Sequence, residues 1–251
     1  MIGGIIIGDE ILRGKREDKH LVKLIALLGA RGLALDWAQY LGDSPALITS
    51  TLKRTFASAD IVFCFGGIGA TPDDHTRACA AAAAGVELHL HPDAEAEMRA
   101  HFKGEITQFR LKMGEFPRGS TIIPNPYNRV PGFSVGDHHF VPGFPIMAWP
   151  MVEWVLDQRY AHLVNTRADA EASVIVYGLY ESLISPLMTD IEARFRSAKT
   201  FSLPSIGDDG KRRHIELGVR GTPDHVAAAI VEMKAAVKVL GGTWEEPAAA
   251  G

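Results

Sequence analysis

The 251-residue sequence has only two cysteines, Cys64 and Cys79. Because one lies in an apolar run and the other in an alanine-rich segment, we expect buried thiols in a reducing compartment and no disulfide framework. No run approaches the roughly 18 apolar residues of a transmembrane helix. The apolar run Ile2–Ile7 is short and is followed at once by Asp9, which argues against a signal peptide. We therefore expect a cytoplasmic protein without a membrane partner.

The sequence also lacks a strong excess of one charge, and no run of lysine and arginine stands out. Lysine and arginine total 26 against 30 aspartates and glutamates, for a net charge of −4. This balance gives no electrostatic reason to expect a nucleic-acid partner. A small anionic ligand would need a local site, because the overall field does not attract it. Hydrophobic residues make up 47% of the chain, enough for a stable core without disulfide or metal cross-links.

Short apolar runs alternate with helical patterns over the first two thirds of the chain. The runs Ile2–Ile7, Leu33–Leu41 and Ile61–Phe65 are typical of buried strands. Each is followed by apolar residues at helical spacing, and the third of these helices is expected to open at Thr71-Pro72-Asp73-Asp74. Such alternation predicts an α/β fold with a parallel sheet and helices on both faces. Proline and glycine are frequent between residues 118 and 145, where we expect short strands.

A change of composition near Asn165–Glu171 predicts a linker between two domains. Beyond it, the periodicity predicts a β-α-β-β-α order with a hairpin turn at Gly207–Arg212, which indicates a small α+β domain. The predicted division is a first domain over 1–165, a second over 170–242 and a flexible tail over 243–251.

The segment Gly66–Thr76 leaves the third predicted strand through a glycine-rich turn. Glycines let the backbone approach a ligand, and unpaired N–H groups at a helix start hold phosphate. The acids of this segment would repel a bare phosphate unless a divalent cation bridged them. Further acids follow the first two strands and should reach the same sheet edge. The predicted metal ligands, with Mg²⁺ or another divalent ion as cofactor, are Asp9, Glu10, Asp43, Asp73 and Asp74. The alternative for Thr71 and Asp74 is a helix-capping box.

Several motifs occur in order between residues 5 and 145: Gly8-Asp9-Glu10-Ile11-Leu12-x-Gly14, Gly42-Asp43, Gly66-Gly67-x-Gly69-x-Thr71-Pro72-Asp73-Asp74-x-Thr76, Asn125-Pro126 and Pro142-Gly143-x-Pro145. Together they resemble the molybdopterin-binding (molybdenum cofactor biosynthesis) domain superfamily. They are most similar to the N-terminal region of the competence/damage-inducible protein A family, whose small second domain the remaining chain also resembles. The resemblance implies a three-layer α/β fold, a pterin or nucleotide ligand, Mg²⁺ and a homo-oligomer, with molybdopterin as an alternative cofactor.

The resemblance also implies roles for individual residues. Two aspartates of the adenylyltransferases in this superfamily fall at Asp43 and Asp74, which we predict to be catalytic. The predicted ligand-binding residues are Gly66, Gly67, Gly69, Thr71, Thr76, Lys19, His20, Asn125, Pro142 and Gly143. Lys19 and His20 stand near the place of a family asparagine that is absent here, and they fit solvated residues of a first helical turn equally well.

Three functions follow as hypotheses. The leading one is a metal-dependent hydrolase that cleaves the pyrophosphate bond of a dinucleotide such as FAD or ADP-ribose. The second is a non-catalytic protein that binds molybdopterin or a nucleotide. The third is a molybdopterin adenylyltransferase, against which the appended second domain counts. The amidohydrolase domain of full-length family members is not part of this sequence, so the resemblance implies no deamidase activity.

Overall fold

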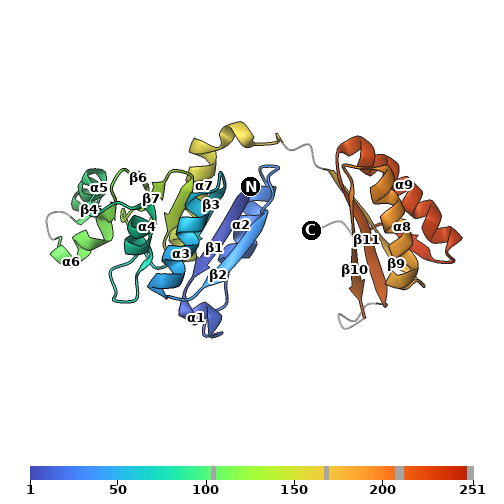
Figure 1. Cartoon of the computed structure of the whole chain (residues 1–251), viewed down its shortest axis with the longest axis horizontal. Coiled ribbons are helices and arrows are strands. Elements are labelled where there is room, and N and C mark those ends of the chain that lie inside the picture. The colour runs from blue at the N-terminus through green and yellow to red at the C-terminus, as the bar shows by residue number, and fades with distance from the viewer. Residues whose placement is uncertain (103–105, 167–169, 207–211, 248–251) are drawn as a thin grey trace. The chain divides into compact units, whose positions relative to one another are not determined.

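The computed structural model describes residues 1–102, 106–166, 170–206 and 212–247. The chain divides into two compact units, Met1–Thr166 and Arg167–Gly251 (Figure 1). The first unit is a three-layer α/β fold, and the second is a small antiparallel sheet with two helices. The predicted fold class is therefore confirmed. Among the described residues, no helix is long and apolar enough to cross a membrane.

Six strands of the first unit, as far as it is described, form one sheet in the order β2-β1-β3-β8-β7-β6. Their bounds are β1 (Ile2–Ile7), β2 (Trp37–Leu41), β3 (Ile61–Phe65), β6 (Thr121–Ile123), β7 (Gly132–Val135) and β8 (His138–Val141). The first four strands in this order, β2, β1, β3 and β8, are parallel to one another, as predicted. Strands β7 and β6 run antiparallel instead. A tight turn at Gly136 joins β7 directly to β8. Because no helix lies between them, the chain reverses and the two strands pair antiparallel.

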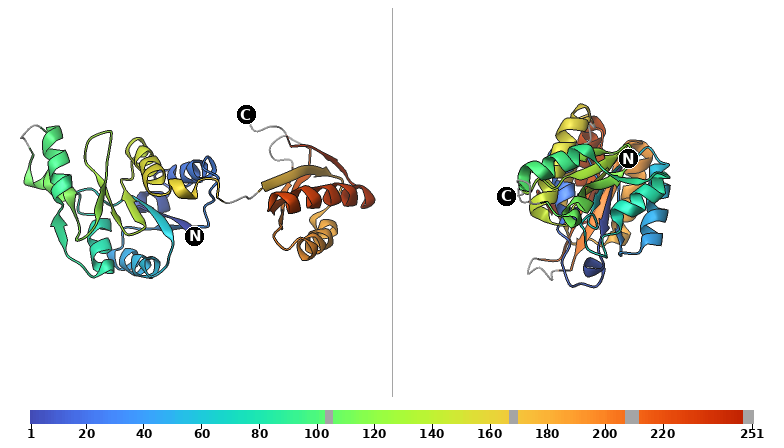
Figure 2. Two further views of the ribbon diagram at one scale, coloured as in Figure 1. Left: turned by 90° about the horizontal axis from the view of Figure 1, so that it is seen from above. Right: turned by 90° about the vertical axis from the view of Figure 1, so that its left-hand side faces the viewer.

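Helices cover both faces of this sheet (Figure 2). On one face, α2 (His20–Gly29) and α7 (Pro145–Arg159) share a hydrophobic core with Ile6 and Phe63. On the other, α3 (Pro45–Phe56) and α4 (Thr76–Ala84) pack with Ile5. Consecutive residues of β1 thus enter opposite cores, which is why its sequence is continuously apolar. The remaining elements are α1 (Asp9–Leu12), β4 (Leu88–Leu90), α5 (Pro92–Phe102), α6 (Gln108–Leu111), β5 (Glu115–Pro117) and two 3₁₀ turns, η1 (Lys112–Gly114) and η2 (Ala161–Leu163).

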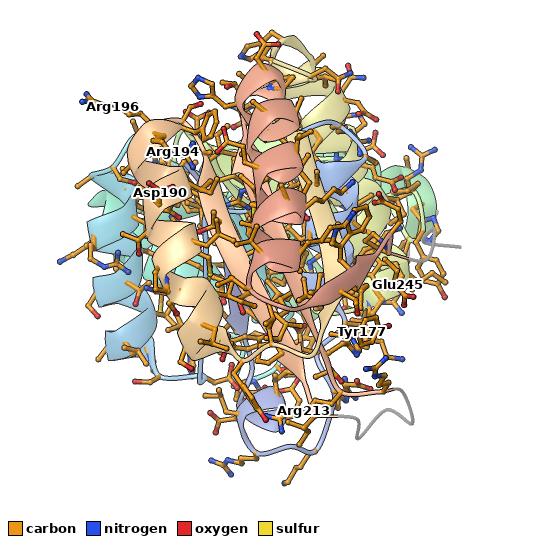
Figure 3. The ribbon with its side chains drawn as sticks, turned by 90° about the vertical axis from the view of Figure 1, so that its right-hand side faces the viewer. Tyr177, Asp190, Arg194, Arg196, Arg213 and Glu245 are labelled. Carbon is orange, nitrogen blue, oxygen red and sulfur yellow. The ribbon has the colours of Figure 1, made fainter. Side chains whose placement is uncertain are left out.

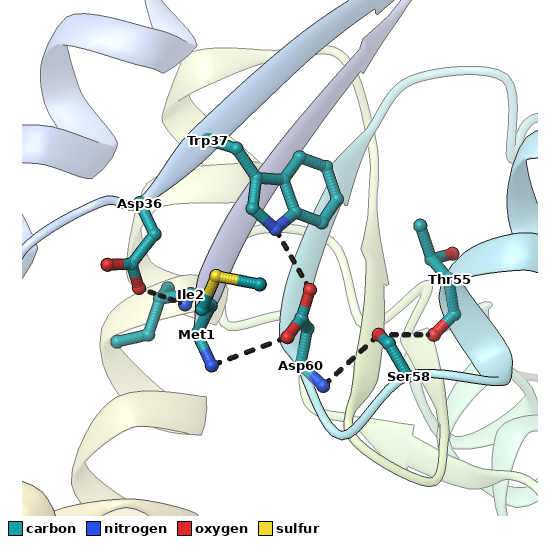
Figure 4. Close-up of polar contacts among 7 residues, drawn as sticks. All are labelled: Met1, Ile2, Asp36, Trp37, Thr55, Ser58 and Asp60. Atoms are coloured by element: carbon teal, nitrogen blue, oxygen red, sulfur yellow. Dashed lines mark hydrogen bonds and ion pairs between the residues drawn. The ribbon is translucent and has the colours of Figure 1, made fainter.

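Polar contacts hold strands β1, β2 and β3 together at their amino ends (Figure 4). The Trp37 ring lies on Gly3, where a Cβ atom would stand 2.2 Å from the ring. Its Nε1 donates to Asp60 Oδ2 at 3.0 Å, and the Ile2 N–H donates to Asp36 Oδ2 at 2.6 Å. These contacts fix the register of β1, β2 and β3, so their carboxyl ends meet at the opposite edge of the sheet.

Helix α4 begins later than the sequence predicts. Thr71 was expected to open it, but α4 starts at Thr76. The Thr71 N–H donates to Asp74 Oδ2 at 2.8 Å, and the Asp74 N–H donates to the Thr71 carbonyl at 3.0 Å. This turn has one of the two bonds of a capping box, because the Asp74 N–H bonds the Thr71 carbonyl and not its hydroxyl, and it does not continue as a helix. Residues 66–75 therefore form a loop at the carboxyl edge of the sheet.

The second unit is a four-stranded antiparallel sheet, ordered β10-β11-β9-β12, with two helices on one face. Its elements are β9 (Ala170–Tyr177), α8 (Glu181–Arg194), β10 (Lys199–Ser205), β11 (His214–Gly221), α9 (Pro223–Val239) and β12 (Thr243–Glu245). Arg194 pairs with Asp190 one turn before it on α8 and with Glu232 on α9, which ties the two helices together (Figure 3). The predicted hairpin turn falls largely on residues 207–211, outside the described residues.

The prediction of a flexible tail over 243–251 is wrong for its first residues. Thr243–Glu245 form β12 and pair with β9. Trp244 packs against the core of this unit and donates its Nε1–H to the Lys234 carbonyl at 3.1 Å. The Tyr177 hydroxyl donates to Glu245 (Figure 3). Packing of the Trp244 ring and pairing with β9 make Thr243–Glu245 an edge strand. Residues 248–251 lie outside the described part.

A chain of hydrogen bonds crosses the core of the first unit beside β8. The Tyr160 hydroxyl donates to Asp137 Oδ1 at 2.7 Å, so it accepts from His139 Nε2, also at 2.7 Å. His139 Nδ1 then accepts from the Ser134 hydroxyl at 2.8 Å. Burial lowers the pKa of His139 to about 3 and that of the neighbouring His138 to about 4. Both imidazoles are therefore neutral in the folded protein at neutral pH.

These two histidines predict a loss of stability in mild acid. In the unfolded chain they take up protons near pH 6.5, whereas the folded protein resists protonation until far lower pH. The free energy of unfolding should therefore fall as pH falls from 7 to 5, which urea titrations at each pH measure. His138→Phe, which removes an unpartnered Nε2, should reduce the slope by up to about 1.4 kcal/mol per pH unit. His162→Phe, at an exposed position, should leave the slope unchanged; equal slopes in all three proteins would contradict the assignment.

Candidate functional site

A cavity of about 640 Å³ lies at the carboxyl edge of the parallel strands. Its walls come from the segments that follow β1, β2, β3 and β8, and from the loops at residues 113 and 125–131. The lining residues are Ile7, Gly8, Glu10, Arg16, Asp43, Gly66, Gly67, Ile68, Gly69, Ala70, Thr71, Asp73, Asp74, Met113, Asn125, Asn128, Val130, Pro131, Pro142, Gly143, Phe144 and Met147. Its volume is within the range of about 300–1,000 Å³ typical of small-molecule sites.

The glycine loop enters the cavity wall in a backbone conformation that requires glycine. Gly66 and Gly67 have φ angles of 98° and 68°. A Cβ on Gly66 would stand 2.3 Å from the Ile7 carbonyl oxygen, so strands β1 and β3 leave no room for a side chain there. No described residue accepts a hydrogen bond from the N–H groups of residues 67–70. Consecutive unpaired N–H groups in a glycine turn form an anion-binding surface.

Thr76 organises this loop from behind. Its side chain is fully buried, and its hydroxyl donates to the Gly66 carbonyl at 3.0 Å. Its N–H donates to the Gly67 carbonyl at 2.9 Å. The sequence predicts Thr76 as a ligand-binding residue, but it does not line the cavity. Its position in the motif is explained by the two carbonyl groups that it holds.

Asp43 and Asp9 bind each other's backbone across the ends of β2 and β1. The Asp9 N–H donates to Asp43 Oδ2 at 2.8 Å, and the Asp43 N–H donates to Asp9 Oδ1 at 3.2 Å. Asp9 Oδ2 pairs with Arg13 at 2.6 Å. Desolvation raises the pKa of Asp43, and the negative charges of Asp9, Glu10 and Asp73 raise it further. The carboxylates from three segments of the sheet edge are thus close enough to repel one another.

The Thr71 hydroxyl lies between two carboxylates of the glycine loop. It is 2.5 Å from Asp73 Oδ1 and 2.6 Å from Asp74 Oδ2. The single hydroxyl proton can serve only one of them at a time. Hydrogen bonding to Thr71 lowers the pKa of Asp73, so that carboxylate is charged at neutral pH. This wall of the cavity therefore presents negative charge beside the N–H groups of the loop.

The five predicted metal ligands are only partly gathered. Glu10, Asp43, Asp73 and Asp74 line the cavity, whereas Asp9 is turned toward Arg13 and the Asp43 backbone. Among the described residues, no three carboxylate, histidine or cysteine side chains are arranged to hold a metal ion by themselves. Mg²⁺ commonly binds through one or two carboxylates together with water and substrate phosphates. The mutual repulsion around Asp43 fits a cation of that kind, shared with a ligand.

Residues 3–162 match the family described as "Probable molybdopterin binding domain". The chain belongs to this molybdopterin-binding family. A CinA-like protein from Anaeromyxobacter sp. (strain Fw109-5) is 29% identical over 236 residues, 85% of this chain and 57% of that protein. One from Anaeromyxobacter dehalogenans (strain 2CP-1 / ATCC BAA-258) is 32% identical over 195 residues, 73% of this chain and 47% of that protein. The chain thus spans about half the length of the curated relatives that it matches.

A solved structure supports the same relationship. The protein CinA of Thermoplasma acidophilum, whose function is given as unknown, superposes with a TM-score of 0.57 at 25% sequence identity. The match covers 62% of this chain and 95% of that one. The predicted resemblance to the competence/damage-inducible protein A family is confirmed by these relatives.

Apolar side chains also line the cavity of the first unit. They are Met113, Val130, Pro131, Phe144 and Met147. Phe144 is 54% exposed, although its ring is large and apolar. The cavity lining thus combines N–H groups and carboxylates with apolar side chains suited to a flat ring.

The predicted ligand-binding residues divide into two groups. Those that line the cavity are Gly66, Gly67, Gly69, Thr71, Asn125, Pro142 and Gly143. Lys19 is exposed and outside the cavity, and His20 is buried behind it. His20 Nε2 lies 3.2 Å from the Gly143 carbonyl, and its ring stacks on Phe65 at 4.7 Å. Burial lowers the pKa of His20, so this neutral imidazole supports Gly143 from below.

Asn125 has little hydrogen-bonding capacity left for a ligand. Its Nδ2 donates to Asn128 Oδ1 at 2.8 Å and to the Val130 carbonyl at 2.9 Å. Its Oδ1 accepts from the Tyr127 N–H at 3.0 Å. Asn125 therefore shapes the loop that carries Asn128 and Val130 into the cavity wall.

Sequence reasoning missed two arginines of this site. Arg16 lines the cavity and has no ion pair with any described residue. Its only sequence signal is the basic pair Lys15-Arg16, which replaces the family pattern. Arg77 is buried and contacts the glycine loop from behind. It directly follows the Thr76 motif, but no spacing rule marks it. Met113 reaches the cavity through tertiary folding alone.

Proposed function

We propose that the molybdopterin-binding unit binds the diphosphate of a dinucleotide and hydrolyses its phosphoanhydride bond with the help of a divalent metal ion. The observation that carries the proposal is the row of unpaired N–H groups at residues 67–70, beside carboxylates that line the same cavity. The N–H groups suit phosphate oxygens, while the carboxylates suit a cation. Only a ligand that brings both phosphate and metal satisfies both kinds of group.

In this proposal Asp43 holds the metal ion together with Glu10 or Asp73. The raised pKa of Asp43 favours this role, because a cation relieves the repulsion among these carboxylates. Such an ion lowers the pKa of a bound water and offsets negative charge on phosphate oxygens. Asp74 has a different part: it closes the Thr71 turn and keeps the loop in shape.

The residues of this chain bind and orient the rest of the ligand. The loop N–H groups hold one phosphate, and the unpaired guanidinium of Arg16 offers bidentate contacts to another. The ring of the ligand lies against Met113, Phe144 and Met147, where stacking and sulfur contacts act on any flat heterocycle. Adenine, flavin and pterin all meet this requirement, so these apolar contacts do not distinguish one ring from another.

A binding protein without catalysis is the second candidate. The absence of a three-ligand metal cluster among the described residues favours it. It predicts that a nucleotide or molybdopterin raises the melting temperature equally with and without metal. The hydrolase predicts a metal-dependent effect. The cytoplasmic location, the homo-oligomer and the lack of a nucleic-acid partner remain predictions.

The test is hydrolysis of ADP-ribose and FAD by the full chain with Mg²⁺, Mn²⁺ or Co²⁺, followed by chromatography of the products. We expect metal-dependent release of AMP that stops when a chelator is added. Arg16→Gln should raise KM with a smaller effect on kcat, because it removes a phosphate contact, and Arg118→Gln, on the exposed surface, serves as its control. No turnover with any metal, together with metal-independent thermal stabilisation by the same ligands, would replace the hydrolase by the binding protein.

A further inference from the structure

Arg77 is a buried cation whose hydrogen bonds, among the described residues, all go to backbone carbonyl groups. It is 8% exposed and lies on the first turn of α4. Its Nη2 donates to the Gly69 carbonyl at 2.6 Å. Its Nη1 donates to the carbonyl groups of Lys112 and Glu115, the latter at 3.3 Å. Burial lowers its pKa, and no carboxylate of the described part of the chain forms an ion pair with it. A guanidinium placed in this way joins the glycine loop to the segment that brings Met113 to the cavity.

The contact at Gly69 determines the direction of the next N–H group. In a trans peptide the C=O of one residue and the N–H of the following residue point in opposite directions. Because the Gly69 carbonyl is turned toward Arg77, the Ala70 N–H is turned away from it. Ala70 lines the cavity, and its N–H has no acceptor among the described residues.

Thr76 sets the two preceding donors in the same manner. It holds the carbonyl groups of Gly66 and Gly67, which turns the N–H groups of Gly67 and Ile68 away from α4. The neighbouring residues Thr76 and Arg77 thus act on successive parts of one loop. Thr76 controls its first two N–H groups, and Arg77 controls the fourth.

We infer that Arg77 is a positioning residue that presets the Ala70 N–H to donate to a phosphate oxygen of the ligand. The inference rests on the phosphate-binding part of the proposed function and does not require hydrolysis. Arg77 itself does not touch the ligand. A fixed donor loses no orientational freedom when the ligand binds. Loss of the Arg77 guanidinium should therefore lower the affinity for phosphate more than it lowers the stability of the fold.

The test uses the full chain and inorganic pyrophosphate with Mg²⁺ as the probe. Amide resonances of residues 67–70 are followed by NMR during titration, and the dissociation constant is measured by calorimetry. In the parent we expect Gly67, Ile68 and Ala70 to shift. In Arg77→Lys, whose ammonium lacks the planar fork, the Ala70 shift should be lost, the other two should persist, and affinity should fall about tenfold.

Arg31→Lys is the matched control. Arg31 is also a largely buried fork, bonded to Asp157 at 2.8 Å and to the Leu27 carbonyl at 3.0 Å, away from the cavity. It should lower the melting temperature without changing pyrophosphate affinity. If Arg77→Lys does not fold, Arg77→Met, which removes the buried charge, is tested in the same way.

The outcomes separate the inference from the function on which it rests. An Ala70 shift and an affinity equal to those of the parent would overturn the role of Arg77, and so would an equal loss of affinity in Arg31→Lys. Pyrophosphate binding without hydrolysis of any dinucleotide would overturn the hydrolase and leave the role of Arg77 supported. No binding by the parent protein would overturn both.

Discussion

An Asp43→Asn variant is expected to lose about 100-fold or more of the proposed hydrolytic activity and yet to unfold at a higher temperature than the parent at pH 7. The amide oxygen can still accept the hydrogen bond from the Asp9 N–H, so the link between β1 and β2 is retained. The charge that desolvation disfavours, and that repels Asp9, Glu10 and Asp73, is removed. We expect a gain of a few degrees in melting temperature.

The pH dependence gives this prediction its sign. The folded pKa of Asp43 lies above its unfolded value, so ionised Asp43 destabilises the fold, and the penalty is relieved as pH falls through the folded pKa. The advantage of Asp43→Asn should therefore be present at pH 7 and shrink in acid. Melting curves at several pH values and AMP release under the same metal conditions measure both effects. Asp224→Asn, at an exposed position in the first turn of α9, should leave activity unchanged and should give no gain in stability, because the negative charge there favours the helix.

A loss of both stability and activity in Asp43→Asn would mean that the charged carboxylate is needed for the turn after β2. Stability gained with activity intact would remove Asp43 from the proposed metal site. Only the combination of higher stability and lost turnover supports a carboxylate retained for function at a cost to the fold.

Gly66→Ala is expected to destabilise the first unit by about 3 kcal/mol. Two effects add at this position. The φ angle of 98° is unfavourable for a residue with a side chain, and the new Cβ would stand 2.3 Å from the Ile7 carbonyl oxygen. That oxygen belongs to the central strand β1, so neither β1 nor β3 can move aside without disturbing the sheet. Urea unfolding of the full chain, followed by tryptophan fluorescence, measures the loss; Trp37, Trp149 and Trp154 lie in the first unit and Trp244 in the second.

Gly85→Ala separates the two effects. Gly85 ends α4 with a φ angle of 69°, but no atom lies within 4 Å of the position of its missing Cβ. The variant should therefore lose only the cost of the left-handed backbone, about 1 kcal/mol. Equal losses in the two variants would show that the close approach of the new Cβ to the Ile7 carbonyl oxygen costs no stability, and that Gly66 is required for its backbone angle alone.

Much of the fold was predictable because its signals are local. The runs Ile2–Ile7 and Ile61–Phe65 became β1 and β3 with the predicted bounds, since a strand buried on both faces is apolar at every position. Ser44-Pro45 lies at the start of α3, where proline suits the first helical position. Thr71 was assigned to a helix start because the capping pattern is the same for a helix and for an isolated turn.

The candidate site was predictable in part for a related reason. Parallel strands bring their carboxyl ends to one edge, so the acids and glycines that follow β1, β2 and β3 could be grouped from their order alone. The direction of each side chain could not. Thr76 and His20 lie within a few residues of cavity residues in the sequence but point into the core, where each holds a carbonyl group of the cavity wall.

The class of fold, the edge of the sheet that carries the site, and the family follow from the amino-acid sequence alone, because they depend on periodicity and on short motifs along the chain. Which residues face the ligand and which support them depends on the folded structure. It brought Met113 and Arg16 to the cavity, turned Asp9 toward Arg13, and placed Arg77 behind Gly69. These assignments depend on packing between segments far apart in the chain, where burial and the need to pair every buried polar group override local pattern.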